Sequence, residues 1–141
     1  MSATLFAGIA RTPDPRTALR RFLALDAVVT TSNGLAYAAL PGPLGRFLGI
    51  GDGLLLGLGV LLVVYGTAVG LLASRSRPRA LPVRLVVAVN AGWTALGLIS
   101  LPLWLSPTAA ALVWIPLQAL VVGGFALLQW LSLRAAGSGA Q

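Results

Sequence analysis

Residues 53–73 read GLLLGLGVLLVVYGTAVGLLA, a run without a charged side chain in which only Tyr65 and Thr67 are polar. A helix of about 20 mainly apolar residues spans the hydrocarbon core of a bilayer, which is roughly 30 Å thick. The apolar residues are continuous rather than alternating, a pattern typical of a spanning helix and not of a strand in a membrane β-barrel. The run therefore predicts a transmembrane helix.

Three more runs of this kind fill most of the remaining chain. They cover residues 22–40, 83–105 and 108–133, and the last is long enough to tilt in the bilayer. Together the four runs predict an all-α fold. We expect a four-helix transmembrane bundle that forms a single membrane domain over residues 1–141.

The connections between the predicted helices are short. The first run stops at Pro41-Gly42-Pro43, and the apolar stretch 41–52 is predicted to be a loop that lies in the membrane interface. Ser106-Pro107 alone separates the last two runs, which predicts a tight hairpin. The terminal stretch 135–141, AAGSGAQ, is predicted to be disordered.

The composition excludes several kinds of chemistry. Apolar residues make up 57% of the chain and charged residues 9%, whereas a soluble domain carries about a quarter charged residues. The absence of Cys excludes disulfides and thiolate metal sites, and the absence of His excludes histidine ligands for haem or zinc. We therefore expect no cofactor and no bound metal.

The arginines lie on alternate sides of the predicted helices. One side carries Arg11, Arg16, Arg20, Arg21, Arg75, Arg77, Arg79, Arg84 and Arg134, and the other carries only Arg46. Because cytoplasmic loops are rich in Lys and Arg, this asymmetry predicts a multi-pass protein of the cell (plasma) membrane with both termini cytoplasmic, N-in and C-in. The net charge of +7 is explained by this topology, so we expect no nucleic-acid partner.

Polar side chains recur inside the predicted spans at helical spacing. Asp26, Thr30, Asn33 and Tyr37 follow one another at i, i+4, i+7 and i+11, so they project from one face of the first helix. Polar residues in the other spans include Tyr65, Asn90, Thr94, Gln118 and Gln129. Lipid cannot hydrogen-bond such groups, so we expect them to face other helices or a cavity.

Their depths coincide when they are counted from the flanking arginines. Asp26, Asn90 and Gln129 each lie about 8–9 Å inside the cytoplasmic boundary, at about 1.5 Å per residue. A second group lies about 14–15 Å deep and consists of Thr30, Thr94 and Tyr65. A third lies about 24 Å deep and consists of Tyr37 and Gln118. The depths predict stacked polar layers in the interior of one bundle.

Two interpretations of this candidate polar layer remain open. In the first, the polar residues, Asn33 included, form hydrogen bonds between helices, and each such bond contributes on the order of 0.6 kcal/mol to stability. In the second, they line a binding cavity that is open to the cytoplasm. In the second interpretation Asp26 is the only ionisable group of the cavity, and an intramembrane acid is a candidate for function.

The two halves of the chain share a short pattern. Asn90 follows Arg84 at the spacing with which Asp26 follows Arg20, and Thr94 corresponds to Thr30. A duplicated hairpin would produce this pattern and would give the bundle a pseudo-two-fold axis along the membrane normal. Glycines spaced four apart, as at Gly53 and Gly57 or Gly66 and Gly70, favour close approach of helices.

Several sequence elements carry a resemblance to a known family. They are LDAVVT at 25–30, NGLAY at 33–37, VNAxW at 89–93, QA at 118–119 and FAxxQ at 125–129. With these elements the chain resembles a family of small, uncharacterised four-span integral membrane proteins of bacteria. The resemblance extends over nearly the whole chain, and it implies a four-helix membrane fold.

The function expected from these features is not enzymatic, because no catalytic base, nucleophile or metal set is visible. We expect a non-catalytic integral membrane protein, a subunit, scaffold or accessory that binds partners through its helices. Its environment is the lipid bilayer, and its partner is another membrane protein or a second copy of the chain. The alternative is a small transporter or ligand-binding membrane protein with a cytoplasm-facing polar cavity around Asp26.

Overall fold

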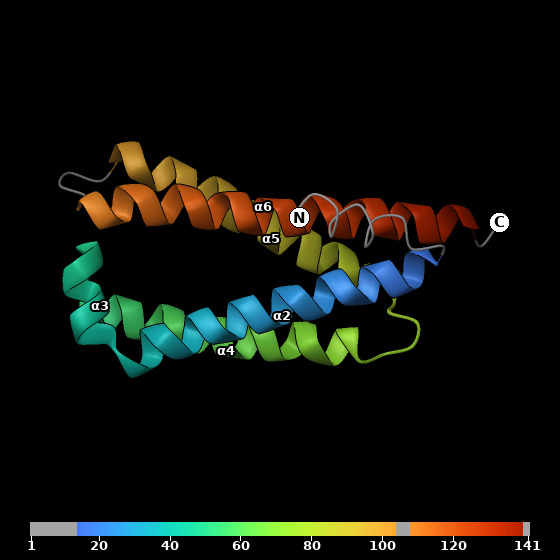
Figure 1. Ribbon diagram of the computed structural model, residues 1–141, viewed down its shortest axis with the longest axis horizontal. Coiled ribbons are helices and arrows are strands. Elements are labelled where there is room, and N and C mark those ends of the chain that lie inside the picture. Colours follow the sequence, from blue (N-terminus) through green and yellow to red (C-terminus); the bar gives the residue numbers. More distant parts are fainter. Residues whose placement is uncertain (1–13, 104–107, 140–141) are drawn as a thin grey trace, which may run out of the picture.

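The computed structural model describes residues 14–103 and 108–139, and these residues form five α-helices (Figure 1). The helices are α2 (Pro15–Ala39), α3 (Pro41–Leu48), α4 (Asp52–Ala73), α5 (Ala80–Leu103) and α6 (Ala109–Gly139). The prediction of an all-α fold is confirmed. Trp104, and the Ser106-Pro107 turn predicted between the last two spans, lie outside the described residues.

The start of α2 is determined by its cap. The Asp14 carboxylate accepts hydrogen bonds from the Arg16 backbone N–H at 3.1 Å and from the Thr17 hydroxyl at 2.7 Å, and Pro15 occupies the first helical position. Aspartate is a preferred N-cap, and proline at this position sacrifices no helical hydrogen bond. The Thr17 hydroxyl, followed by the Arg16 N–H, lowers the pKa of Asp14. The helix thus begins before the predicted span does.

A sharp bend separates α2 from α3. The two helices meet at 101°, with Leu40 and Pro41 at the junction. A proline disfavours helical geometry at the residue before it, which explains the break. The prediction of a loop over 41–52 is wrong for most of that stretch. It folds as a short helix, which ends at Gly49 in the left-handed conformation that glycine adopts readily (φ 72°).

The helices form two pairs, α2 with α4 and α5 with α6 (Figure 1). Glycines allow α2 and α4 to approach closely, because a Cβ at Gly34 would lie 2.7 Å from the Gly59 carbonyl oxygen and one at Gly59 would lie 2.6 Å from the Ala38 nitrogen. Such small residues are the usual contacts between membrane helices. A Cβ at Gly53 or Gly57 would meet open space, with no neighbouring helix within 4 Å, so this glycine pair takes no part in the contact.

Two apolar clusters lie inside the molecule. One lies near the arginine-rich end and is formed by Leu19, Leu23, Ala27, Val69, Ala73, Val83 and Val86. The other lies toward α3 and is formed by Tyr37, Leu48, Leu55 and Leu62. Their residues come from different helices, so each cluster connects segments that are distant in the sequence.

Three helices, α4, α5 and α6, are long and apolar enough to cross a membrane, and α2 with α3 qualifies as a bent pair. The structure therefore has three candidate spans, or four if the bent pair is one span. α2 is less apolar than the others because it carries the polar stripe that begins at Asp26. Large apolar side chains are exposed along the outer faces of the helices, as with Leu103 and Leu120 at 75% each. These features are those of a multi-pass helical membrane protein.

The last helix extends beyond its predicted end. α6 continues to Gly139, past residue 133 and into the stretch 135–141 that was predicted to be disordered. Ala135 and Ala136 are strong helix formers, and no proline stops the helix before Gly139. Residues 140 and 141 lie outside the described part of the chain.

Candidate functional site

A buried carboxylate lies at the centre of the molecule. Asp26 has 0% of its surface exposed. Its Oδ1 accepts a hydrogen bond from the Thr30 hydroxyl at 2.9 Å, and its Oδ2 accepts one from Asn90 Nδ2 and one from Gln129 Nε2, both at 2.7 Å. All three donors are neutral. They supply hydrogen bonds to both carboxylate oxygens, as buried polar groups require.

The partners of Asp26 are also bonded to one another. Asn90 Nδ2 donates a second hydrogen bond to Gln129 Oε1 at 3.1 Å. The Tyr65 hydroxyl lies 2.9 Å from Asn90 Oδ1, to which it donates, and 3.3 Å from the Val86 carbonyl oxygen. We call Asp26, Thr30, Tyr65, Asn90 and Gln129 the polar cluster. It joins side chains from all four long helices, α2, α4, α5 and α6.

The arginine-rich end of the polar cluster is closed by apolar side chains. Three residues of the polar cluster each have an apolar side chain one helical turn away, on the side toward the arginines. These side chains are Leu23 next to Asp26, Val86 next to Asn90 and Val69 next to Tyr65. Arg20 is not among the hydrogen-bond partners of Asp26 in the described residues, and its Nε donates to the Ala73 carbonyl oxygen at 3.1 Å. That carbonyl belongs to the C-terminal turn of α4, which attracts cations. The structure thus places a packed layer between Asp26 and the charged end.

Of the seven residues predicted for the site, five form the polar cluster, and two lie outside it. Thr94 stands one turn beyond Asn90, where its hydroxyl donates to the Asn90 backbone carbonyl at 2.9 Å and also lies 3.4 Å from the Ala119 carbonyl oxygen. Asn33 is half-buried and lines a cavity farther along the molecule.

Two contacts near the α3 end were not predicted as pairs. Trp114 Nε1 donates a hydrogen bond to the Tyr37 hydroxyl at 2.7 Å, which connects α6 to α2. The Thr108 hydroxyl donates to the Phe47 carbonyl oxygen at 3.0 Å and connects the start of α6 to α3. Counting from the arginines had matched the depth of Tyr37 with that of Gln118 rather than Trp114, so no sequence signal pointed to the first contact. Both contacts lie at the end opposite the arginines, and the first of them links the two helix pairs directly.

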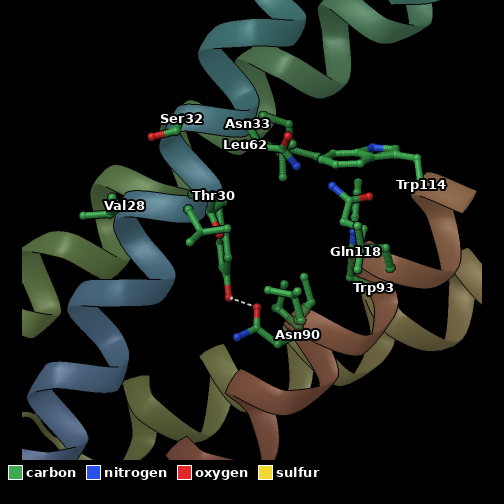
Figure 2. A pocket seen from close by; sticks show the side chains of 16 residues that line it. Val28, Thr30, Ser32, Asn33, Leu62, Asn90, Trp93, Trp114 and Gln118 are labelled. Carbon is green, nitrogen blue, oxygen red and sulfur yellow. Dashed lines mark hydrogen bonds between the residues drawn. The ribbon is translucent and has the colours of Figure 1, made fainter. Parts of the chain in front are cut away.

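A cavity lies between the helix pairs, between the polar cluster and α3. It consists of two adjoining pockets of about 570 and 880 Å³ that share Trp93, Trp114 and Gln118. The smaller pocket also reaches Asn33, and it borders the polar cluster at Thr30, Tyr65 and Asn90 (Figure 2). We call the two pockets the inter-pair cavity. It exists because α4 and α5 contact each other little, so the pairs separate beyond the polar cluster.

The inter-pair cavity differs from the cytoplasm-facing cavity that the sequence left open as an alternative. Asp26 lines neither pocket, and the residues that do line them include no acid and no arginine. Most are leucines, valines and isoleucines, and the polar groups are amides, hydroxyls and the indole of tryptophan. Such a surface can bind by apolar contact and hydrogen bonding.

No protein-family model matches the chain, and no curated protein or solved structure matches it either. The resemblance to a family of small four-span bacterial membrane proteins therefore stays a prediction. The helical membrane fold that the resemblance implied is present in the structure.

Proposed function

We propose that this chain is a non-catalytic, four-span integral membrane protein of the cell membrane that binds partners through its helices. The observation that carries the proposal is the state of Asp26, the only ionisable side chain of the span 22–40 apart from the weakly acidic Tyr37. Three neutral donors form hydrogen bonds to the Asp26 carboxylate, and apolar side chains separate it from the arginine-rich end of the molecule. A group held in this way supports interhelical structure rather than proton transfer or catalysis.

The orientation in this proposal has both termini in the cytoplasm. The start of α2, the connection from α4 to α5 and the end of α6 lie at one end of the molecule, and α3 lies at the other (Figure 1). Of the nine arginines in the described residues, eight belong to segments at the first end and only Arg46 of α3 lies at the other, which supports the assignment of the first end to the cytoplasm. The bent pair α2 and α3 then supplies the first span and its turn at the outer surface.

A duplicated hairpin is consistent with the same structure. Asp26 and Asn90 hold corresponding positions in the two halves of the sequence, and their side chains are hydrogen-bonded to each other at 2.7 Å. A contact between equivalent residues is expected close to a pseudo-two-fold axis. The pairs α2 with α4 and α5 with α6 would be the two copies.

Transport through a polar cavity at Asp26 has less support. Such a cavity has to reach the carboxylate from the cytoplasmic end, where Leu19, Leu23 and Val83 are almost fully buried in a packed cluster.

Photo-crosslinking in native membranes tests binding through the helices. A photoreactive amino acid is placed at Val64 of α4, Leu85 of α5 or Leu120 of α6, whose side chains are all exposed. Val69, which is buried, serves as the control position. The proposal expects a discrete protein adduct, either with another membrane protein or with a second copy of the chain, from at least one exposed position and none from Val69. Lipid adducts alone at every exposed position would contradict it.

A further inference from the structure

Two side-chain amides face the inter-pair cavity from opposite helix pairs. Asn33 projects from α2 and Gln118 from α6, and Figure 2 shows both directed into the space between them. Among the described residues the Asn33 side chain has no hydrogen-bond partner, while Gln118 lies beside the Tyr37 hydroxyl. No buried side-chain nitrogen or oxygen in the described residues lacks a partner, so the Asn33 amide is open to the cavity rather than sealed in the protein.

These amides lie deep in the apolar part of the molecule. Asn33 follows Arg21 by 12 residues, and Gln118 precedes Arg134 by 16, which places them roughly 18 and 24 Å from the arginine-rich boundary at about 1.5 Å per residue. Each amide offers two donors and an acceptor. The Tyr37 hydroxyl beside Gln118 uses only part of this capacity. Hydrocarbon cannot satisfy the remainder, above all at Asn33, so retaining both amides in one cavity is unfavourable unless a polar group binds there.

The cavity wall specifies the remaining chemistry of such a ligand. Trp93, Trp114 and the surrounding leucines provide an apolar surface, and both pockets have the volume of sites that enclose small molecules, about 300–1,000 Å³. The lining residues include no charged side chain, so a charged ligand would be buried without a counter-ion.

We propose that the inter-pair cavity binds a neutral lipophilic molecule that carries a carbonyl or hydroxyl oxygen. The oxygen is held by the amides of Asn33 and Gln118, and the apolar body lies along the larger pocket against Trp93 and Trp114. A phospholipid is not the expected occupant, because its charged headgroup belongs at the membrane surface and the amides lie below it. This ligand site goes beyond partner binding through the outer helix faces and does not depend on it.

The ligand enters sideways from the membrane. The rim of the larger pocket is formed by Leu54 on α4 and by Leu96 and Leu103 on α5, all of them exposed apolar side chains. Because α4 and α5 make few contacts with each other, the opening between them faces lipid. A lipophile therefore reaches the amides without crossing water.

Photolabelling of the purified full chain in phosphatidylcholine nanodiscs tests the proposal. The probe is hexadecanol with a diazirine in its chain, and the charged control is the matching alkyl sulfate. We expect the alcohol to label peptides that contain Trp93, Leu96 or Trp114, and excess hexadecanol to suppress that labelling. The sulfate should label these peptides at least about fivefold less. Equal labelling by both compounds, or labelling that excess hexadecanol does not suppress, would overturn the proposal.

Variants identify the groups that hold the oxygen. The double variant Asn33→Leu/Gln118→Leu should reduce cavity labelling at least about fivefold, whereas Leu120→Ala, on an exposed face, should leave it unchanged. If the double variant fails to fold, each single variant is measured and must lower the labelling at least about twofold. Unchanged labelling in the folded variants would show that the amides do not bind the alcohol, and the proposal would fall. Crosslinking at Val64, Leu85 and Leu120 reports separately on partner binding.

Discussion

Replacing Asp26 separates a structural role of the polar cluster from a functional one. In Asp26→Leu, Gln129 Nε2 loses its hydrogen bond to the carboxylate. The Asn90 amide keeps its other hydrogen bond, to Gln129 Oε1. The Thr30 hydroxyl can donate to a backbone carbonyl of its own helix instead. One buried donor is therefore left without a partner. Its desolvation costs about 1–3 kcal/mol of unfolding free energy. We take the free-energy cost of losing the other two hydrogen bonds to be offset by the gain from no longer burying a carboxylate.

Asp26→Asn should behave differently. The asparagine oxygen can accept from Asn90 and Gln129 in place of Oδ2, and its NH₂ group can donate to the Thr30 hydroxyl, which is able to accept as well as donate. All three contacts survive, so this variant should unfold close to the wild-type temperature.

Thermal unfolding of the purified protein in one detergent measures both variants. Thr67→Leu is the control, because Thr67 is exposed and its hydroxyl bonds only to the Val63 carbonyl of its own helix. We expect the wild-type protein, Asp26→Asn and Thr67→Leu to unfold at similar temperatures. Asp26→Leu should unfold at a clearly lower temperature. An Asp26→Leu protein as stable as the control, or an Asp26→Asn protein as unstable as Asp26→Leu, would refute the reasoning. Loss of an uptake or resistance activity in a normally folded Asp26→Asn protein would instead favour transport.

Three further predictions concern packing, the α3 end and the start of α2. Gly34→Ala should destabilise the protein by about 1–3 kcal/mol, because the new Cβ would lie 2.7 Å from the Gly59 carbonyl oxygen. Gly57→Ala is the control: its Cβ would meet open space, so this variant should unfold at or above the wild-type temperature. Tyr37→Phe leaves the Trp114 indole N–H without its acceptor and should cost about 1 kcal/mol in the same unfolding assay; no change would mean that the bond is not formed. Because the pKa of Asp14 is lowered in the folded protein, its ionised carboxylate stabilises α2 at pH values above the ordinary pKa of 3.8. This stabilisation is lost as the pH falls through the lower pKa of the folded state. The protection of the Arg16 and Thr17 amides, taken relative to their intrinsic exchange rate at each pH, should therefore fall only at acid pH, and in Asp14→Ala it should be low at every pH.

Part of the site could be predicted because the rise of a helix is constant. Asp26, Asn90 and Gln129 each stand five or six residues from an arginine at the end of a span, so their depths follow from counting, and the structure brings the three side chains within hydrogen-bonding distance. Periodicity also placed the polar stripe of α2 on one face. It could not tell that Asn33, on that same face, lies where the helix pairs have separated.

The remaining features depend on how helices pack against one another. The close approach of α2 and α4 at Gly34 and Gly59, and the wide spacing of α4 from α5, are results of side-chain fit that no spacing within one helix encodes. The inter-pair cavity follows from that difference and was missed for this reason. The short helix α3 was missed because its proline-rich and glycine-rich sequence, PGPLGRFL, is also typical of a loop.

The central claim is a four-span membrane protein with both ends in the cytoplasm, and cysteine labelling in intact cells tests it most directly. The chain has no cysteine of its own, so each introduced one is unique. Gly51→Cys lies between α3 and α4, Ser76→Cys between α4 and α5, and Gly137→Cys near the end of α6. A membrane-impermeant maleimide should label only Gly51→Cys in intact cells, and it should label the other two once the cells are opened. Labelling of Ser76→Cys or Gly137→Cys from outside intact cells would contradict the claim.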